Sequence, residues 1–292
     1  MSLASQPIVE TDRRPVLLVV PGNLGGSVEH FYHFLFGYLL PFLEHCHAMR
    51  GSHRFQMRDC GPMNRLLRGL PGFHIAVKPV YKVLETVVGT VPGSAGTARI
   101  MVPGFDAPHA YNPERFRRIR RIVARLFGPQ IDSFARAHPL AASERLVLVI
   151  DRAPPPPEYL ADGTEAKSGG SARRSVPNMA EVFAAIAERH DALLVRLEEC
   201  SLLEQVFLFS RAWRVVGQHG AGLSHMIWAR PDAGLVEIMP NPKQLSNDAQ
   251  WQAAYFATLC RSLALPRRMV EQTDPHDPVP PEAVVAALAA LD

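Results

Sequence analysis

Cysteine, long apolar runs and an excess of charge of one sign are all scarce in this sequence. Its 292 residues include four cysteines, none of them in a Cys-x-x-Cys pair. A disulfide framework or a zinc site is therefore not expected, and a reducing cytoplasm suits this cysteine usage best. No apolar run reaches the 18 or so residues that a membrane span requires. The N-terminal residues also lack the basic start and apolar centre of a signal peptide, so we expect a cytoplasmic protein.

The charges nearly cancel. Thirty-one Lys and Arg against 28 Asp and Glu leave a net charge of +3, which is too small to indicate a nucleic-acid partner. Basic side chains nevertheless crowd one predicted helix, residues 115–125. Such a face is ordinarily solvated, but it also suits an anionic glycan or peripheral contact with the inner face of an anionic membrane. The arginines of this helix are Arg115, Arg117, Arg118, Arg120, Arg121 and Arg125.

Proline, by contrast, is abundant. The chain has 26 prolines in 292 residues, roughly 9% against a usual share of about 5%. This excess predicts many turns around a compact core. Four prolines form the run Pro154–Pro157 within residues 153–172, which are rich in Pro, Gly and small polar side chains. We interpret this stretch as a surface loop rather than as a proline-rich ligand of another domain.

The N-terminal half opens with a short β-branched run, residues 14–20, that ends in a glycine-rich turn. This pattern predicts a buried strand followed by a loop. A helix capped by Ser27 follows, because aromatic and leucine side chains recur there at helical spacing. Residues 51–110 are predicted to form short strands and turns, and they carry no motif. Asn112 then caps a second helix, whose expected core residues are Phe116, Ile119, Val123 and Leu126.

From about residue 143 the pattern changes to strands that alternate with helices. Strands are predicted over residues 146–152, 193–199, 213–218 and 234–239. Helices are predicted between them, one opened by a capping box, and an alanine-rich helix ends the chain. Strands alternating with helices indicate an α/β fold with a parallel sheet of the Rossmann-like type.

The most informative stretch runs from Val215 to Ser224, where a buried strand ends in a glycine-rich turn that opens into a helix. Glycines let an anion approach the backbone, and the helix dipole favours negative charge at this end. The turn lacks the Gly-Lys-Ser/Thr of a Walker loop, and its spacing departs from GxGxxG. A tight turn without a ligand is the alternative. The predicted phosphate-binding residues are His219, Gly220, Ala221, Gly222 and Leu223.

Other side chains extend this candidate phosphate site. Arg152 follows a predicted strand, at the edge where parallel sheets bind ligands, and Arg174 precedes the helix that starts at Asn178. Guanidinium groups suit a diphosphate because they donate several hydrogen bonds in a fixed geometry. Glu237 ends the next strand, where a carboxylate meets ribose hydroxyl groups in nucleotide-binding folds. Its alternative role is to brace the loop.

These residues together resemble the family-61 glycosyltransferases, the capsular-polysaccharide-type or EOGT-like group. The resemblance is strongest over residues 146–240 and depends on Arg152, Arg174, Asn178 and above all Gly-x-His-Gly-Ala-Gly-Leu at 217–223. A weaker match lies at His33-Phe34-Leu35. There the family often has an asparagine where this chain has His30, and an acidic residue where it has Gly37.

The resemblance implies a GT-B fold, with two Rossmann-like domains facing across a cleft. Residues 1–142 would form the acceptor-side domain, residues 143–272 the nucleotide-sugar domain, and residues 273–292 a helix that packs back on the N-terminal domain. It further implies inverting transfer from a nucleotide-sugar, usually a UDP-sugar, to a glycan or polysaccharide hydroxyl without a metal or other cofactor. The sequence independently lacks an Asp-x-Asp triplet that would hold a divalent ion.

Inverting transfer needs a general base for the acceptor hydroxyl, and the candidates are Glu29, His30 and His33. His33 matches the family position, and histidine titrates near neutrality. His30 and His33 lie one helical turn apart, so they also suit acceptor binding or a metal pair, although no third metal ligand is evident. A core or capping contact is the ordinary interpretation of either histidine.

Three other functional classes remain as alternatives. A catalytically degenerate nucleotide- or glycan-binding protein of the same fold is supported by Gly37. An NAD-type oxidoreductase is suggested by the glycine turn with Glu237, but the glycine spacing argues against it. A nucleic-acid binder using residues 115–125 is disfavoured by the near-neutral net charge.

Overall fold

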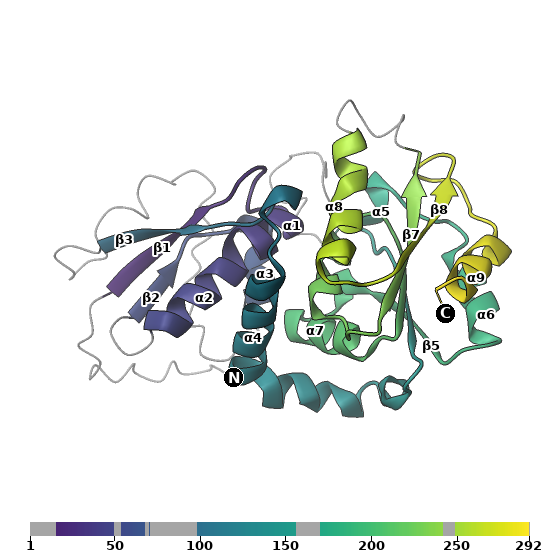
Figure 1. The fold of residues 1–292 in the computed structure, drawn as a ribbon, viewed down its shortest axis with the longest axis horizontal. Coiled ribbons are helices and arrows are strands. Elements are labelled where there is room, and N and C mark those ends of the chain that lie inside the picture. Colours follow the sequence, from purple (N-terminus) through teal and green to yellow (C-terminus); the bar gives the residue numbers. More distant parts are fainter. Residues whose placement is uncertain are drawn as a thin grey trace, which may run out of the picture.

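The computed structural model describes residues 16–49, 54–67, 70, 98–155, 170–241 and 249–291. Residues 71–97 of the expected strand region lie outside these ranges, and so do residues 156–169 of the proline-rich stretch. Two parallel sheets organise the described chain (Figure 1). The structure is therefore of the α/β class with Rossmann-like parallel sheets, as the alternating pattern predicted.

The N-terminal sheet has three parallel strands in the order β2-β1-β3. Its central strand, β1 (Val16–Gly22), pairs with β2 (Arg54–Met57) and β3 (Ala98–Pro103). The predicted strand over residues 14–20 thus becomes the centre of this sheet. The glycine-rich turn follows the carboxyl end of β1 and lies beside the segment that follows β3.

The C-terminal sheet has five strands in the order β5-β4-β6-β7-β8, and every neighbouring pair is parallel. The first strand of this sheet therefore lies between the second and the third, the arrangement of a doubly wound fold. Four of the strands were predicted, whereas the fifth was not. The strands are β4 (Val147–Asp151), β5 (Ala192–Arg196), β6 (Arg214–Gln218), β7 (Gly234–Pro240) and β8 (Arg267–Gln272).

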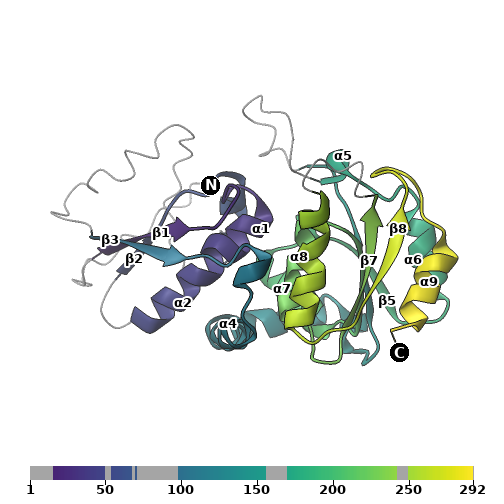
Figure 2. The same cartoon turned by 45° about the horizontal axis from the view of Figure 1, so that its top comes forward.

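Helices cover both faces of the five-stranded sheet. Figures 1 and 2 show α7 and α8 on the face toward the three-stranded sheet, and α6 and α9 on the opposite face. The longer helices are α2 (Leu40–Met49), α4 (Pro113–Ser133), α6 (Met179–Ala187), α7 (Leu202–Arg211), α8 (Ala249–Ser262) and α9 (Pro281–Ala289). Shorter helical segments include α1 (Phe31–Phe34), the π-helix η1 (Leu35–Leu39), α3 (Asn64–Leu67), η3 (Pro108–Ala110), α5 (Gly170–Arg173), η7 (Leu197–Glu199) and the 3₁₀ helix η8 (Ala221–Trp228).

Alternate residues of the central strands enter two hydrophobic cores. In β4, Leu148 and Ile150 face the core that is shared with the N-terminal helices, whereas Val147 and Val149 face the core under α6 and α9. This two-residue period is a property of the extended strand, and burial on both faces explains why β4 is a continuous apolar run. The first core joins the two sheets through α4 and α7, so it holds the loops of both sheets near one another.

Three expectations need correction. The first helix begins at Phe31 rather than after Ser27, whose hydroxyl accepts only from Glu29 N within the preceding turn. Leu126 is 40% exposed, and Phe127, four residues after Val123, is buried instead. The C-terminal helix α9 packs against α6 and β8 rather than on the N-terminal half, since Val284 and Leu288 complete the second core.

Among the helices in the described ranges, none combines the length and the apolar character needed to cross a bilayer.

Burial of His225 makes the stability of the protein depend on pH. The imidazole is fully buried between the rings of Phe31 and Phe209, and its Nδ1 accepts a hydrogen bond from Trp228 Nε1 at 3.0 Å. Desolvation lowers the pKa of His225 to about 3, so the folded protein keeps it neutral where the unfolded chain protonates it.

We therefore predict that the free energy of unfolding falls as the pH drops below about 6.5, by about 1.4 kcal/mol per pH unit from this group. His225→Asn keeps an acceptor for Trp228 but does not titrate. Between pH 6.5 and pH 5, the free energy of unfolding of this variant should therefore fall by about 2 kcal/mol less than that of the wild type. Urea unfolding at several pH values measures both slopes. His109→Asn, at an exposed histidine, should match the wild type, and equal slopes for all three proteins would contradict the prediction.

Candidate functional site

The strand order of the five-stranded sheet opens a crevice at its carboxyl edge. Because β4 lies between β5 and β6, the connections after β4 and β6 leave toward opposite sides, and such a switch point is where α/β sheets bind ligands. Arg152 directly follows β4, and the loop His219–Gly222 directly follows β6. The structure therefore brings together two predicted site segments that lie about seventy residues apart in the chain.

A cavity of about 290 Å³ lies at this edge and extends to the N-terminal helix α1. Most of the predicted site residues line it, whereas Glu29, Asn178 and Glu237 do not. The predicted residues in the lining are His30, His33, Arg152, Arg174, His219, Gly220, Ala221, Gly222 and Leu223. Candidates for proton transfer and for phosphate binding thus share one cavity.

Two guanidinium groups converge on a single backbone oxygen. Arg152 Nη2 and Arg174 Nη1 each donate a hydrogen bond of 2.9 Å to the carbonyl of His219. Burial, opposed by the charge of Glu198, lowers the pKa of Arg152 to about 10. Burial, together with the neighbouring guanidinium groups of Arg152 and Arg173, lowers the pKa of Arg174 to about 9. Within the described residues, neither of the two converging arginines is within ion-pair distance of a carboxylate. The cluster is therefore a crowded positive site that an anion would stabilise.

Glycine at position 220 lets Arg152 reach this carbonyl. A Cβ at Gly220 would overlap with Nη2 of Arg152, and a Cβ at Gly222 would lie 2.8 Å from Leu197 Cδ1. Both glycines therefore permit close packing around the loop. The helix expected after the turn is η8, which is 3₁₀ rather than α-helical over its eight residues.

The His219 side chain contacts a buried network of charged side chains. Its Nδ1 lies 2.5 Å from Glu237 Oε1, and Arg267 Nε donates to Glu237 Oε2 at 2.5 Å. Burial lowers the pKa of His219, although Glu237 opposes this shift. The Glu237 side chain has no exposed surface, and it contacts His219 without lining the cavity. Glu237 therefore orients the loop.

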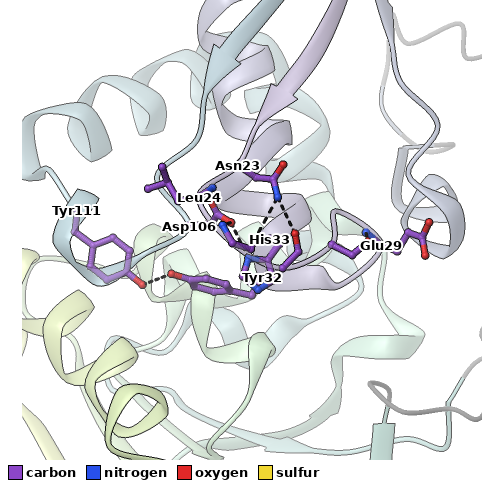
Figure 3. A network of polar contacts seen from close by, with 10 residues as sticks. Asn23, Leu24, Glu29, Tyr32, His33, Asp106 and Tyr111 are labelled. Carbon is purple, nitrogen blue, oxygen red and sulfur yellow. Dashed lines mark hydrogen bonds and ion pairs between the residues drawn. The ribbon is translucent and has the colours of Figure 1, made fainter. Parts of the chain in front are cut away.

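A second histidine–carboxylate pair faces the cavity from the N-terminal half (Figure 3). His33 Nδ1 lies 2.6 Å from Asp106 Oδ2, and the Asp106 side chain is fully buried. Gly26, in the turn after β1, has φ +67, and a Cβ there would overlap with the His33 ring. The amide of Asn23 donates to the Gly26 carbonyl at 2.7 Å and fixes this turn. The glycine turn thus packs directly on the imidazole.

The other predicted residues have different positions. His30 is exposed at the cavity wall, where desolvation and then the neighbouring His33 and Arg173 lower its pKa. Glu29 is exposed outside the lining, and its side chain lies against Gly61. Asn178 exchanges two hydrogen bonds with the backbone of Val279, of 2.8 and 3.0 Å. It therefore joins the start of α6 to the segment before α9.

Several residues in or beside the cavity were missed by the sequence reasoning. Asp106 does not line the cavity but contacts His33, which does. It follows shortly after β3, which ends at Pro103, and an acidic residue beyond the carboxyl end of a parallel strand is a signal for the ligand-binding edge. Arg65 has no such signal: it comes from α3, and its Nη1 donates to the carbonyl of Glu198 at 2.8 Å, across to the other sheet. Tyr255 and Phe256 line the cavity from α8, a helix that was not predicted.

Within the ranges that the structure describes, no group of three or more His, Cys, Asp or Glu side chains is arranged to hold a metal ion. His30 and His33 therefore find no third ligand of these types among those residues.

Comparison with known proteins gives one result. The family model described as Glycosyltransferase 61 matches residues 31–236, well over half of the chain. This match runs from α1 into β7, so it includes cavity residues of both α1 and the carboxyl edge of the five-stranded sheet. No curated protein matches the chain.

The turn after β1 offers a matched pair of glycine substitutions. Gly26→Ala forces a side chain onto the His33 ring and into a left-handed backbone conformation, so we expect a loss of about 1–3 kcal/mol of stability. Gly25→Ala meets nothing within 4 Å and should be nearly neutral. Urea unfolding of both variants measures the difference. Equal stabilities would show that the turn does not pack on His33 as described.

Proposed function

The chain belongs to the glycosyltransferase 61 family, and on that premise we propose that it catalyses inverting transfer of a sugar from a nucleotide-sugar to a glycan or polysaccharide hydroxyl. The proposed donor is a UDP-sugar, and the capsular-polysaccharide or EOGT-like subtype belongs to the same proposal. The observation that carries it is that Arg152 and Arg174 converge on a cavity that also contains His33.

The two sides of the cavity suit the attacking group and the leaving group of an in-line displacement. On one side, the acceptor oxygen attacks the anomeric carbon while His33 takes the hydroxyl proton as general base. On the other, the bond from that carbon to the diphosphate oxygen breaks, and the electron pair leaves with the nucleoside diphosphate. Arg152, Arg174 and the loop at Gly220 stabilise the developing negative charge. Because these arginines supply positive charge, we propose that no metal ion is essential.

The same proposal divides the chain into two facing Rossmann-like domains of the GT-B type. The boundary falls near residue 143, shortly before β4 begins at Val147. Residues 1–142 would bind the acceptor and residues 143–272 the nucleotide. The helices α1 and α3 of the first segment and the carboxyl edge of the five-stranded sheet line one cavity, which supports this division.

The basic face of α4 belongs to the proposed acceptor side. Arg115 and Arg118 are paired with Glu44, whereas Arg121 and Arg125 are exposed beside a second groove. We propose that these two exposed cations meet an anionic glycan or the inner face of an anionic membrane, in a protein that works in the cytoplasm.

Binding of nucleoside diphosphates tests the donor site. Wild-type protein should show a thermal shift with UDP or another nucleoside diphosphate, because the ligand binds only the folded state. Arg152→Ala and Arg174→Ala should each weaken binding about 10- to 100-fold, since each loses charge-assisted hydrogen bonds. Arg189→Ala is the control: Arg189 is exposed in the segment that follows α6, so this variant should bind normally. A wild type that responds to no nucleoside diphosphate would refute the donor site.

Turnover tests the reaction itself. Incubation with a panel of nucleotide-sugars should release the nucleoside diphosphate, faster with an acceptor glycan, and His33→Gln should slow this release by about two orders of magnitude or more. Coupled detection of the released diphosphate measures the rate. Binding without release in any wild-type reaction would instead indicate a catalytically degenerate nucleotide-binding protein.

A further inference from the structure

Asp106 reaches His33 because the backbone around it is anchored to the first helix and to β1. The segment Gly104–Asp106 follows β3, and Gly104 N donates to the carbonyl of Gly22 at 3.0 Å. Phe105 N donates to the carbonyl of Phe36 at 3.0 Å. Phe36 belongs to the π-helix η1, a type of segment that is rare and frequent at functional sites. Two backbone bonds thus fix the Asp106 carboxylate beside α1.

Two glycines leave the space that this carboxylate fills. A Cβ at Gly37 would lie 3.0 Å from Asp106 Cγ, and a Cβ at Gly104 would lie 2.9 Å from Asp106 Oδ1. Both distances are shorter than ordinary contacts between side chains, so a larger residue at either position would displace Asp106. Position 37, one turn after His33 on the same helix face, therefore carries no side chain, and a carboxylate from the end of β3 occupies its place.

Three donors surround the two oxygens of Asp106 and determine its orientation. Leu24 N donates to Oδ1 at 2.8 Å, and Gly25 N approaches Oδ2 at 3.4 Å. His33 Nδ1 lies against Oδ2 at 2.6 Å. A carboxylate only accepts hydrogen bonds, so Nδ1 must carry the proton and Nε2 of the neutral ring must be the basic nitrogen.

We propose that Asp106 is the positioning residue of the transfer, holding His33 in the tautomer whose Nε2 accepts the proton of the acceptor hydroxyl. The inference builds on the proposed function, since it assigns how the base is prepared. When His33 takes the acceptor proton on Nε2, the imidazolium keeps its Nδ1 proton and donates it as a hydrogen bond to the Asp106 carboxylate. Asp106 stays ionised and stabilises that charge in a site shielded from water.

Asp106→Asn separates this role from simple packing. Leu24 N requires an acceptor at the Oδ1 position, so the amide oxygen of the asparagine stays there and its NH₂ group faces His33. An NH₂ group donates, so Nδ1 must become the acceptor and the ring proton moves to Nε2. Nε2 can then no longer take a proton from the acceptor.

The experiment combines nitrogen NMR of ¹⁵N-histidine-labelled protein with turnover. The His33 signals are assigned by their loss in His33→Gln. We expect the Nδ1–H tautomer in the wild type and the Nε2–H tautomer in Asp106→Asn. Turnover should fall by about 100-fold or more in kcat, while the affinity for the nucleoside diphosphate stays within about twofold.

Glu204→Gln is the matched control. Glu204 Oε1 lies 2.8 Å from His138 Nε2 in a second histidine–carboxylate pair that does not line the cavity. Glutamine keeps the capping box of α7, so this variant should leave the His33 tautomer and turnover unchanged.

The possible results distinguish a failure of the inference about Asp106 from a failure of the proposed function. An Nε2–H tautomer in the wild type overturns the inference, and this measurement does not depend on whether Asp106→Asn folds. An unchanged tautomer in Asp106→Asn, or an inverted tautomer with undiminished kcat, also overturns it. A wild type with the Nδ1–H tautomer that binds the nucleoside diphosphate but never releases it from a nucleotide-sugar contradicts the proposed function instead.

Discussion

In both sheets the first strand in the chain lies between the second and the third, and all strands are parallel. The connections on either side of the first strand therefore leave in opposite directions, and a crevice opens at the carboxyl edge. In the N-terminal sheet this edge carries the glycine turn after β1 and Asp106 after β3. In the C-terminal sheet it carries Arg152 and the loop at His219. The glycine turn and Asp106 both contact His33 of α1, and the shared core between the sheets keeps α1 and the C-terminal edge on one cavity.

The two histidines of this cavity are prepared in the same physical way. His33 and His219 each turn Nδ1 toward a carboxylate with no exposed surface, Asp106 or Glu237. A buried carboxylate fixes both the orientation and the tautomer of an imidazole, because it only accepts hydrogen bonds. The environments differ nevertheless. His219 lies among the arginines that converge on its own carbonyl, whereas His33 lies against a glycine turn, and this difference supports separate roles in leaving-group binding and proton transfer.

Much of the C-terminal half was predictable from the sequence. The apolar runs at β4, β6 and β7 are strands because both of their faces are buried, and Ser201 with Glu204 forms the expected capping box. The glycine loop and Arg152 are local signals at strand ends, so their place at the sheet edge followed from pattern alone. The sequence did not reveal α8 and β8, whose mixed polar composition obscures their periodicity. It also mispredicted where α9 packs, since several apolar surfaces could accept an alanine-rich helix.

The sequence by itself determined the α/β class, most strands of the five-stranded sheet and the position of the glycine loop after β6, because periodicity and glycine spacing are local properties of the chain. Only the tertiary structure decided which side chains meet. The absence of a carboxylate at Gly37 looked like a lost catalytic group, yet Asp106, 69 positions later, fills that space. Likewise Glu237 contacts His219 instead of the open cavity. Contacts between distant segments depend on strand order and on the close approach that glycines permit, and neither is encoded in the neighbouring residues.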